Sequence, residues 1–189
     1  SKTQVRLFFI STRKWLSAHR LEYVLWENVL IGVSEAVVWG ERGFDPAYLN
    51  PLSFIYSAQH NGQDRDNLLM EGDVTVSVRK RALIYMALLI DDLSTSQIGK
   101  GFVGNKIGVM AGAQFMDLEL DGLIAGIEYI RLEPFVYTHF YPVNRFTNWT
   151  SSLGAGLKPN SDRLTLDLNY RLIRSLTCDA QFSFNRHGD

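Results

Sequence analysis

Two long runs near the C-terminus alternate strictly between apolar and polar residues. In residues 163–172 (RLTLDLNYRL) every second side chain is apolar, and the same pattern returns in residues 176–184. An α-helix would distribute these apolar residues around its surface, because its period is 3.6 residues rather than 2. Each run is about as long as a tilted strand needs to cross the hydrocarbon core of a bilayer, roughly 9–11 residues. The pattern predicts long amphipathic strands of the kind found in transmembrane β-barrels.

The rest of the chain divides into segments of the same character. About ten segments have the length and composition of strands. In chain order they are 5–12, 16–26, 29–39, 68–78, 83–92, 106–115, 123–132, a ragged one within 135–157, 162–172 and 176–185. The connections between them include tight turns at 27–28 and 79–81 and long loops at 40–67, 93–105 and 142–149. Outer-membrane barrels likewise have short turns at one end and longer loops at the other.

These features predict an all-β fold with a single domain over residues 1–189. The expected architecture is an antiparallel transmembrane β-barrel, or a partial barrel, with long extracellular loops, one of which holds a short helix near Pro51. A partial barrel leaves unpaired backbone groups at both edges, which lipid does not tolerate. Either ten strands close by themselves or other strands complete the wall. Because residues 5–10 already resemble a strand and no export signal precedes them, we expect the chain to be part of a longer protein.

Composition excludes several classes of function. The 19 Lys and Arg residues balance 20 Asp and Glu residues, and no basic stripe is visible, which argues against a nucleic-acid binder. A single cysteine, Cys178, supports neither a disulfide framework nor a zinc site. No run approaches 18 uninterrupted apolar residues, so no transmembrane helix is expected. We expect no cofactor and no metal.

Six ionisable residues fall on or beside the predicted strands. They are His19, Arg20, Glu35, Asp91, Glu128 and Arg131. A charge on the lipid-facing side of a barrel costs about 2–4 kcal/mol near the midplane, so we expect these side chains to form a polar network in the lumen. Residues 83–90 (LIYMALLI) are instead apolar on both faces, which fits either a lumen covered by an inserted segment or the core of an ordinary sandwich. A histidine and an aspartate pair without a supporting spacing do not indicate a hydrolase, and we expect no catalysis.

Several short motifs occur in order along the chain. They are HRLE at 19–22, GVSE at 32–35, LNPL at 49–52, Asn67, IDD at 90–92, EYIR at 128–131, YTH at 137–139, and LG at 153–154 with PNSD at 159–162. In this order they resemble the capsule assembly Wzi family of bacterial outer-membrane proteins, from about residue 16 to the C-terminus. Lys158 departs from the resemblance, since a glycine is expected there. The resemblance implies that this chain is the C-terminal portion of a monomeric barrel with a blocked lumen, which holds capsular polysaccharide or exopolysaccharide at the cell surface without catalysis.

A polysaccharide at the barrel mouth would meet residues of the long loops. The expected binding residues are the aromatic rings of Tyr48, Phe146 and Trp149, which stack on sugar faces, and the hydrogen-bonding side chains of Asn50, Asp92, His139 and Asn160. The expected partners are surface polysaccharide and outer-membrane lipid, together with additional strands or subunits if the barrel is incomplete.

Three other interpretations stay open. The chain could be a structural subunit that contributes strands to a larger outer-membrane assembly. It could be a porin-like diffusion channel, which polar side chains on the lumen face permit, although the doubly apolar segment 83–90 argues for a blocked interior. It could also be a soluble β-sandwich or a lipocalin-like carrier, which would need a polar outer face on every strand.

Overall fold

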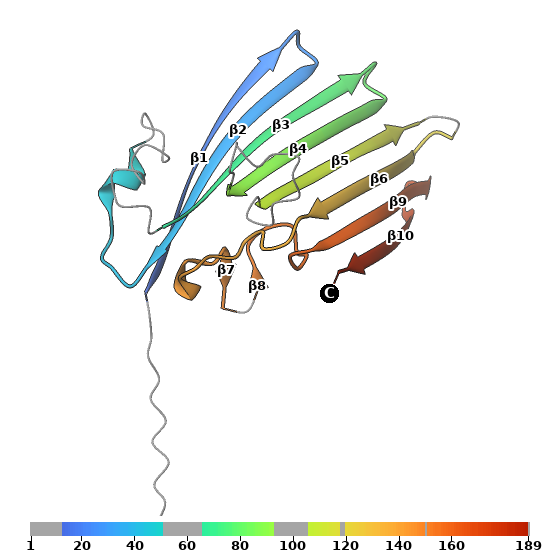
Figure 1. Ribbon diagram of the computed structural model, residues 1–189. Helices are drawn as coiled ribbons and strands as arrows, with labels where there is room; N and C mark the ends of the chain where they lie inside the picture. Colours follow the sequence, from blue (N-terminus) through green and yellow to red (C-terminus); the bar gives the residue numbers. More distant parts are fainter. Residues whose placement is uncertain (1–12, 51–65, 93–105, 118–119, 150, 189) are drawn as a thin grey trace, which may run out of the picture.

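Eight long antiparallel strands and one very short hairpin make up the fold (Figure 1). The structure is a computed structural model, and it describes residues 13–50, 66–92, 106–117, 120–149 and 151–188. The long strands are β1 (Lys14–Leu25), β2 (Val29–Gly40), β3 (Asn67–Val78), β4 (Ala82–Asp92), β5 (Lys106–Met116), β6 (Leu123–Leu132), β9 (Ser161–Ile173) and β10 (Leu176–His187). The short elements are the 3₁₀ turns η1 (Pro46–Leu49) and η3 (Pro142–Asn144) and the strands β7 (Thr147–Asn148) and β8 (Ser151–Ser152).

The long strands follow one another in space as they do in the chain. Their order is β1-β2-β3-β4-β5-β6-β9-β10, so the sheet is a simple meander. Eight of the expected strands agree with these elements to within a few residues. The strand expected at 5–12 and the helix expected near Pro51 fall outside the described residues. In place of one ragged strand within 135–157, the described part of that stretch holds η3, the two short strands β7 and β8, and irregular chain.

The sheet is open. Within the described part of the chain, β1 pairs only with β2 and β10 pairs only with β9. The expectation of an antiparallel all-β fold is therefore confirmed, whereas closure into a barrel is not found in this sheet. Both edge strands are 12 residues long and present a row of unpaired backbone groups.

Alternate residues of each strand project from opposite faces of the sheet. We name the first the apolar face, because aliphatic and aromatic residues dominate it on every long strand. On β9 and β10, for example, Leu166 lies opposite Phe182 and Leu168 lies opposite Ala180, as the alternation predicts. Large side chains in the middle of this face are exposed, among them Leu21 at 75% and Phe182 at 61%. The second face, the polar face, carries Arg20, Asp73, Tyr85, Glu128, Thr165, Asp167 and Gln181.

The two ends of the sheet differ in their connections. At the turn end, short segments join β1 to β2, β3 to β4, β5 to β6 and β9 to β10. Two of these turns hold consecutive non-glycine residues with positive φ, Trp26–Glu27 and Arg79–Lys80, as the twist of a primed hairpin turn requires. At the loop end, long segments join β2 to β3, β4 to β5 and β6 to β9. The expected contrast between turns and loops is thus present, and all tight connections lie at one end.

Two loop segments cover opposite faces of the sheet at the loop end. The segment with η1 packs on the apolar face, where Tyr48 is 2% exposed and meets Val37, Trp39 and Leu68. The segment between β6 and β9 packs on the polar face and forms a second buried cluster. Its members are Leu69, Ile130, Leu132, Val136 and Tyr137, with Leu89, Met110, Phe146, Ala155 and Leu157 against them. Leu89 belongs to the doubly apolar segment 83–90, so a covering segment accounts for the apolar residues on its polar face.

Candidate functional site

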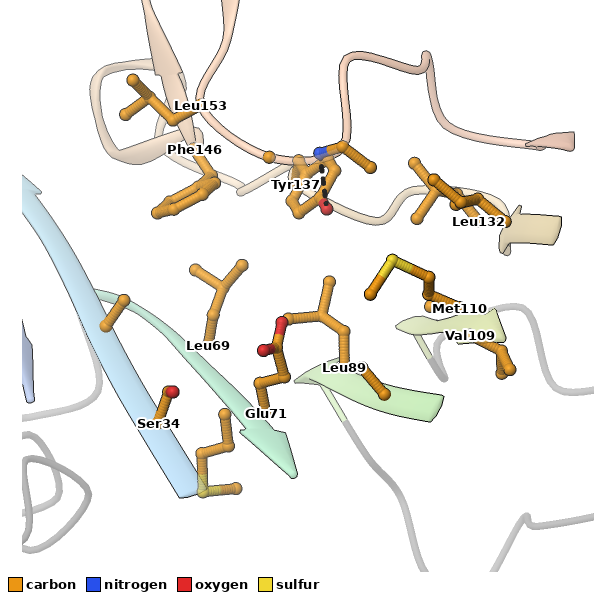
Figure 2. Close-up of a pocket in the computed structure, with 17 residues that line it drawn as sticks. Ser34, Leu69, Glu71, Leu89, Val109, Met110, Leu132, Tyr137, Phe146 and Leu153 are labelled. Atoms are coloured by element: carbon orange, nitrogen blue, oxygen red, sulfur yellow. Dashed lines mark hydrogen bonds between the residues drawn. The ribbon is translucent and has the colours of Figure 1, made fainter. Parts of the chain in front are cut away.

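A cavity lies between the polar face of the sheet and the loop that joins β6 to β9 (Figure 2). Its volume is about 340 Å³. The loop wall includes Tyr137, Phe146 and Leu153, and the sheet wall includes Leu69, Leu89 and Met110. Glu71 and Ser34 add polar groups at the rim nearer the middle of the sheet. The cavity is lined mainly by apolar groups.

Tyr137 anchors the covering loop to the sheet. Its backbone N–H donates a hydrogen bond to the carboxylate of Asp91 at the end of β4, and its hydroxyl accepts one from the backbone N–H of Ala155 at 3.3 Å. Its ring stacks on Phe146 with centroids 5.6 Å apart, and it lies so close to Gly154 that a Cβ there would overlap the ring. Burial raises the pKa of the Tyr137 hydroxyl. These contacts hold the loop in place against the loop end of the polar face.

An ion pair crosses the polar face nearer to the turn end. The guanidinium of Arg20 on β1 contacts Asp73 on β3 at 2.7 Å and Glu22 at 2.7 Å, and it donates to the hydroxyl of Ser34 at 2.8 Å. It reaches β3 across β2 at Gly32, where an added Cβ would overlap both Arg20 and Asp73. A larger residue at position 32 would therefore displace the ends of both side chains from this ion pair.

A second side chain bridges the polar face in the same way. The hydroxyl of Tyr85 on β4 donates to the carboxylate of Glu128 on β6 at 3.0 Å. Tyr85, Gly112 and Glu128 lie in one row across β4, β5 and β6, and the tyrosine ring covers the glycine. On β9 and β10 the row continues as Thr165 and Ser183, whose hydroxyl oxygens are 3.5 Å apart, and in the next row Gln181 donates to Asp167 at 2.7 Å. The uncovered part of this face is therefore polar and internally hydrogen-bonded.

Two further hollows flank the segment 156–158 at the loop end. The first, about 500 Å³, lies against residues 136–138 and the hairpin β7–β8 and includes Arg145 in its wall. The second, about 370 Å³, lies against the ends of β9 and β10 and includes Arg163, Arg186 and His187. Lys158 lines both hollows. The described lining residues of the two hollows include five that carry or can carry positive charge and no carboxylate.

Exposed aromatic rings surround the same region. Trp149 is 95% exposed at the turn of the β7–β8 hairpin, and Phe140 is 88% exposed before η3. Tyr141 contacts Phe140 edge to face, with centroids 5.2 Å apart. Aromatic rings at such exposure offer apolar faces to any ligand that reaches the loops.

The structure separates the seven expected binding residues. Trp149 is exposed, His139 is half-buried beside Tyr141, and the Nδ1 atom of His139 accepts a hydrogen bond from the Tyr141 backbone at 3.2 Å. Phe146 faces the apolar cavity, and Asn160 accepts a hydrogen bond from Arg131 at 3.3 Å. Asn50 is exposed at the end of η1, and the side chain of Asp92 lies outside what the structure describes.

Tyr48 has a different role from the one expected. It is buried on the apolar side of the sheet, its ring packs on Trp39 at 4.9 Å, and its hydroxyl donates to Asp66 at 2.6 Å. Burial, followed by the Asp66 contact, raises the pKa of this hydroxyl. Its ring faces are therefore not available to stack on a sugar in this structure, because they form part of the core.

The six residues expected in a lumenal network do not all lie on one face of the sheet. The register places Arg20, Asp91 and Glu128 on the polar face. It places three others on the apolar face: His19, Glu35 and Arg131. His19 lies directly across from Glu35. The sequence analysis grouped these residues because all are ionisable, whereas their odd or even positions along each strand assign them to opposite faces of the sheet.

Several site residues were missed by the sequence analysis. The roles of Tyr137 and Arg163 and the position of Arg145 were not predicted, because they depend on contacts between the loop and distant strands. The alternation in residues 163–172 already placed Arg163 on the polar face with Thr165 and Asp167, but it did not indicate a binding role. The positions of Tyr137 and Arg145 carry no comparable signal, since the chain around them is irregular.

Comparison with known proteins gives no assignment. No family model, no curated protein and no solved structure matches this chain. Within the described residues, no helix has the length and hydropathy needed to span a membrane. The same residues contain no group of three or more His, Cys, Asp or Glu side chains placed to hold a metal ion.

Proposed function

We propose that this chain forms part of the wall of a non-enzymatic outer-membrane β-barrel whose loop end binds surface polysaccharide. The observation that carries the proposal is the difference between the two faces of the sheet. Strands of 10 to 13 residues carry a continuous, exposed apolar face on one side and hydrogen-bonded polar residues on the other. Water-soluble proteins rarely expose apolar patches of more than a few hundred Å², whereas lipid covers such a face in a barrel.

The positions of the charged residues support the same orientation. The middle of the apolar face carries aliphatic and aromatic residues on β3, β4 and β5, and none of the described side chains on that face of those strands is ionisable. Charges on this face of β6, β9 and β10 gather at the loop end, where Asp162 lies between Arg131 and Arg186 and pairs with Arg186 at 2.6 Å. Tyr129 donates to the same carboxylate at 3.1 Å, as expected for an aromatic residue at the polar boundary of a bilayer.

The loop end supports the polysaccharide part of the proposal. It combines exposed aromatic rings with exposed or half-exposed polar side chains, which is the chemistry that sugar rings need: an apolar ring face to stack on and hydrogen-bonding groups around it. Trp149 is the most exposed of these rings. The resemblance of the ordered motifs to the capsule assembly Wzi family points in the same direction and is part of this proposal.

The unpaired edges favour one alternative, in which this chain contributes strands to a larger assembly in the outer membrane. In lipid, β1 and β10 must find further strands, because each unpaired backbone group in the hydrocarbon core costs several kcal/mol. Those strands belong either to a longer form of this chain or to a second subunit. A single species of monomer mass in detergent would favour the first source, and a second chain that purifies with the protein would favour the second.

Lipid contact is tested with two neighbouring positions on β10. In a Cys178→Ser background, Ala180→Cys places a thiol on the apolar face and Gln181→Cys places one on the polar face. An environment-sensitive fluorophore attached at position 180 should be quenched by brominated lipid in reconstituted vesicles, and the same label at position 181 should not. Equal and weak quenching at both positions would contradict the membrane wall.

Polysaccharide binding is tested with two exposed tryptophans at opposite ends of the sheet. Trp149→Ala should weaken retention of surface polysaccharide on cells, while the heat-modifiable gel mobility of the folded protein stays unchanged. Trp26→Ala, at the turn end, is the matched control, because Trp26 is also exposed, at 78%. If Trp149→Ala leaves retention unchanged, Trp149 is not part of the site. If both variants reduce retention equally, the effect is not local to the loop end.

A further inference from the structure

The two hollows beside residues 156–158 form one positively charged region. They share the segment Gly156–Lys158, so the lysine side chain stands between them. Of the remaining cations, Arg186 is paired with Asp162. Arg145, Lys158 and Arg163 have no carboxylate partner within the described part of the chain. Three positive charges without counter-charges among the described residues thus lie in the neighbouring walls of this region.

Arg163 supplies a second, independent observation. Its Nη2 atom donates to the backbone oxygen of Ala155 at a long 3.4 Å, and its Nε atom is buried without a hydrogen-bond acceptor among the described residues. A buried donor without an acceptor is rare in folded proteins. An arginine held in this way has unused capacity to bind an anion, because its planar fork suits a carboxylate.

The other lining groups indicate what carries that anion. Thr138, Thr147, Ser151 and Ser152 contribute hydroxyls to the first hollow, and Ser161 and Asn185 contribute polar groups to the second. Trp149 lies in the hairpin that forms one wall. Hydroxyls, amides and an exposed ring around several cations match a glycan that carries carboxylates on more than one residue, because two adjacent hollows can hold successive acidic units.

We infer that this region binds an acidic polysaccharide, with uronic acid carboxylates held by Arg145, Lys158 and Arg163. The inference rests on the proposed function and names the chemical class of its ligand. A lipid phosphate is a poorer fit, because Arg163 projects from the polar face, on the side away from the face proposed to contact lipid. On the apolar face the arginines of the same end are occupied: Arg186 binds Asp162, and Arg131 contacts Glu133 and Asn160.

The test compares two forms of one glycan on the full-length protein in detergent. Polygalacturonate oligomers are the acidic probe, and the same oligomers with carboxyl groups reduced to alcohols are the neutral probe. The acidic form should bind at least tenfold more tightly at low ionic strength, and the difference should shrink as salt is added, because screening weakens exposed charge pairs. Equal affinity for the two forms would overturn the acidic ligand and leave the proposed function standing. Binding of neither form would count against both.

Variants locate the site. Arg145→Gln, Lys158→Gln and Arg163→Gln should each weaken binding of the acidic probe about threefold, and the triple variant at least tenfold, with little effect on the neutral probe. Arg174→Gln, in the β9–β10 turn at the opposite end, removes the same charge from the chain and should leave binding unchanged. Equal losses in the triple variant and in Arg174→Gln would mean that only net charge matters. Displacement of the acidic probe by lipid A phosphate from the wild type, but not from the triple variant, would assign the site to lipid instead. Heat-modifiable mobility confirms that each variant is folded.

Discussion

Glycine has a defined task at position 32, where the Arg20–Asp73 ion pair crosses β2. Gly32→Ala should therefore weaken this ion pair and destabilise the protein by up to about 1 kcal/mol, because the added Cβ overlaps the ends of two flexible side chains, which must shift. Gly72→Ala is the control: nothing lies within 4 Å of its Cβ position, so the change should be neutral or slightly stabilising. Unfolding of the two variants in detergent and denaturant provides the comparison. A smaller effect at position 32 than at position 72 would show that the ion pair does not depend on the glycine.

Tyr137 should make the fold sensitive to alkali. Its pKa is raised by burial in the folded state, so the neutral hydroxyl is preferred there, and its contribution to stability is complete below the ordinary tyrosine pKa of about 10. That contribution is lost as the pH rises from that value through the higher pKa of the folded state. Tyr137→Phe should reduce the loss of stability between pH 9 and about pH 11. At neutral pH the same substitution should destabilise the protein by about 1 kcal/mol, because the hydrogen bond from the Ala155 N–H is lost. Unfolding curves at several pH values decide this, and an unchanged pH profile would contradict it.

Sequence alone predicts some residue positions better than others. The apolar residues of β9 and β10 could be assigned to one face because a strand has a period of exact alternation, and the register confirms them. The burial of Tyr48 and Trp39 could not be predicted, since it depends on the η1 segment folding over the apolar face. Aromatic residues in loops look alike in sequence whether they bind a ligand or close a core.

At the scale of elements, the hairpin turns carry conformational strain. Arg79 and Lys80 have φ values of 50° and 58°, which cost a non-glycine residue roughly 1–2 kcal/mol each in the left-handed region. The pair of substitutions Arg79→Asn and Lys80→Gly should stabilise the protein by about 1 kcal/mol, because asparagine and glycine suit a primed turn. Ser175→Gly is the control, since the β9–β10 turn has no positive φ to relieve. Midpoints of denaturant unfolding measure both, and equal shifts would point away from turn strain.

Strand bounds could be read from the sequence, whereas the covering loop could not. The limits of β6, Leu123–Leu132, coincide with the expected segment because alternation and flanking turn residues agree there. The segment between β6 and β9 was expected to hold a strand. Its aromatic residues instead pack on Leu69 and Leu89, which belong to strands far away in the chain. No local pattern encodes such contacts, so a segment stabilised mainly by them is difficult to predict from sequence.

At the scale of the whole molecule, the two open edges should behave differently in lipid and in solution. If further strands pair with β1 and β10, alternate backbone amides of β10 that lack a partner in this sheet should be protected from hydrogen exchange in reconstituted vesicles. Exchange measured peptide by peptide gives the result, with the central strand β4 as an internal standard of full protection. Rapid exchange of β10 in vesicles would mean that this edge meets water rather than another strand.

The side chains that cross a neighbouring strand above a glycine also favour the observed register of the strands. A slip of β2 by two residues keeps every side chain on its own face, so the alternation of apolar and polar residues cannot detect it. The same slip would replace Gly32 with Leu30 or Ser34 beneath the Arg20–Asp73 pair, and either side chain would collide with it. Gly112 lies beneath the Tyr85 ring in the same way, so a two-residue slip of β5 would place a side chain against that ring. A two-residue slip that preserves the hydropathy pattern is thus disfavoured at two places, at Gly32 on β2 and at Gly112 on β5.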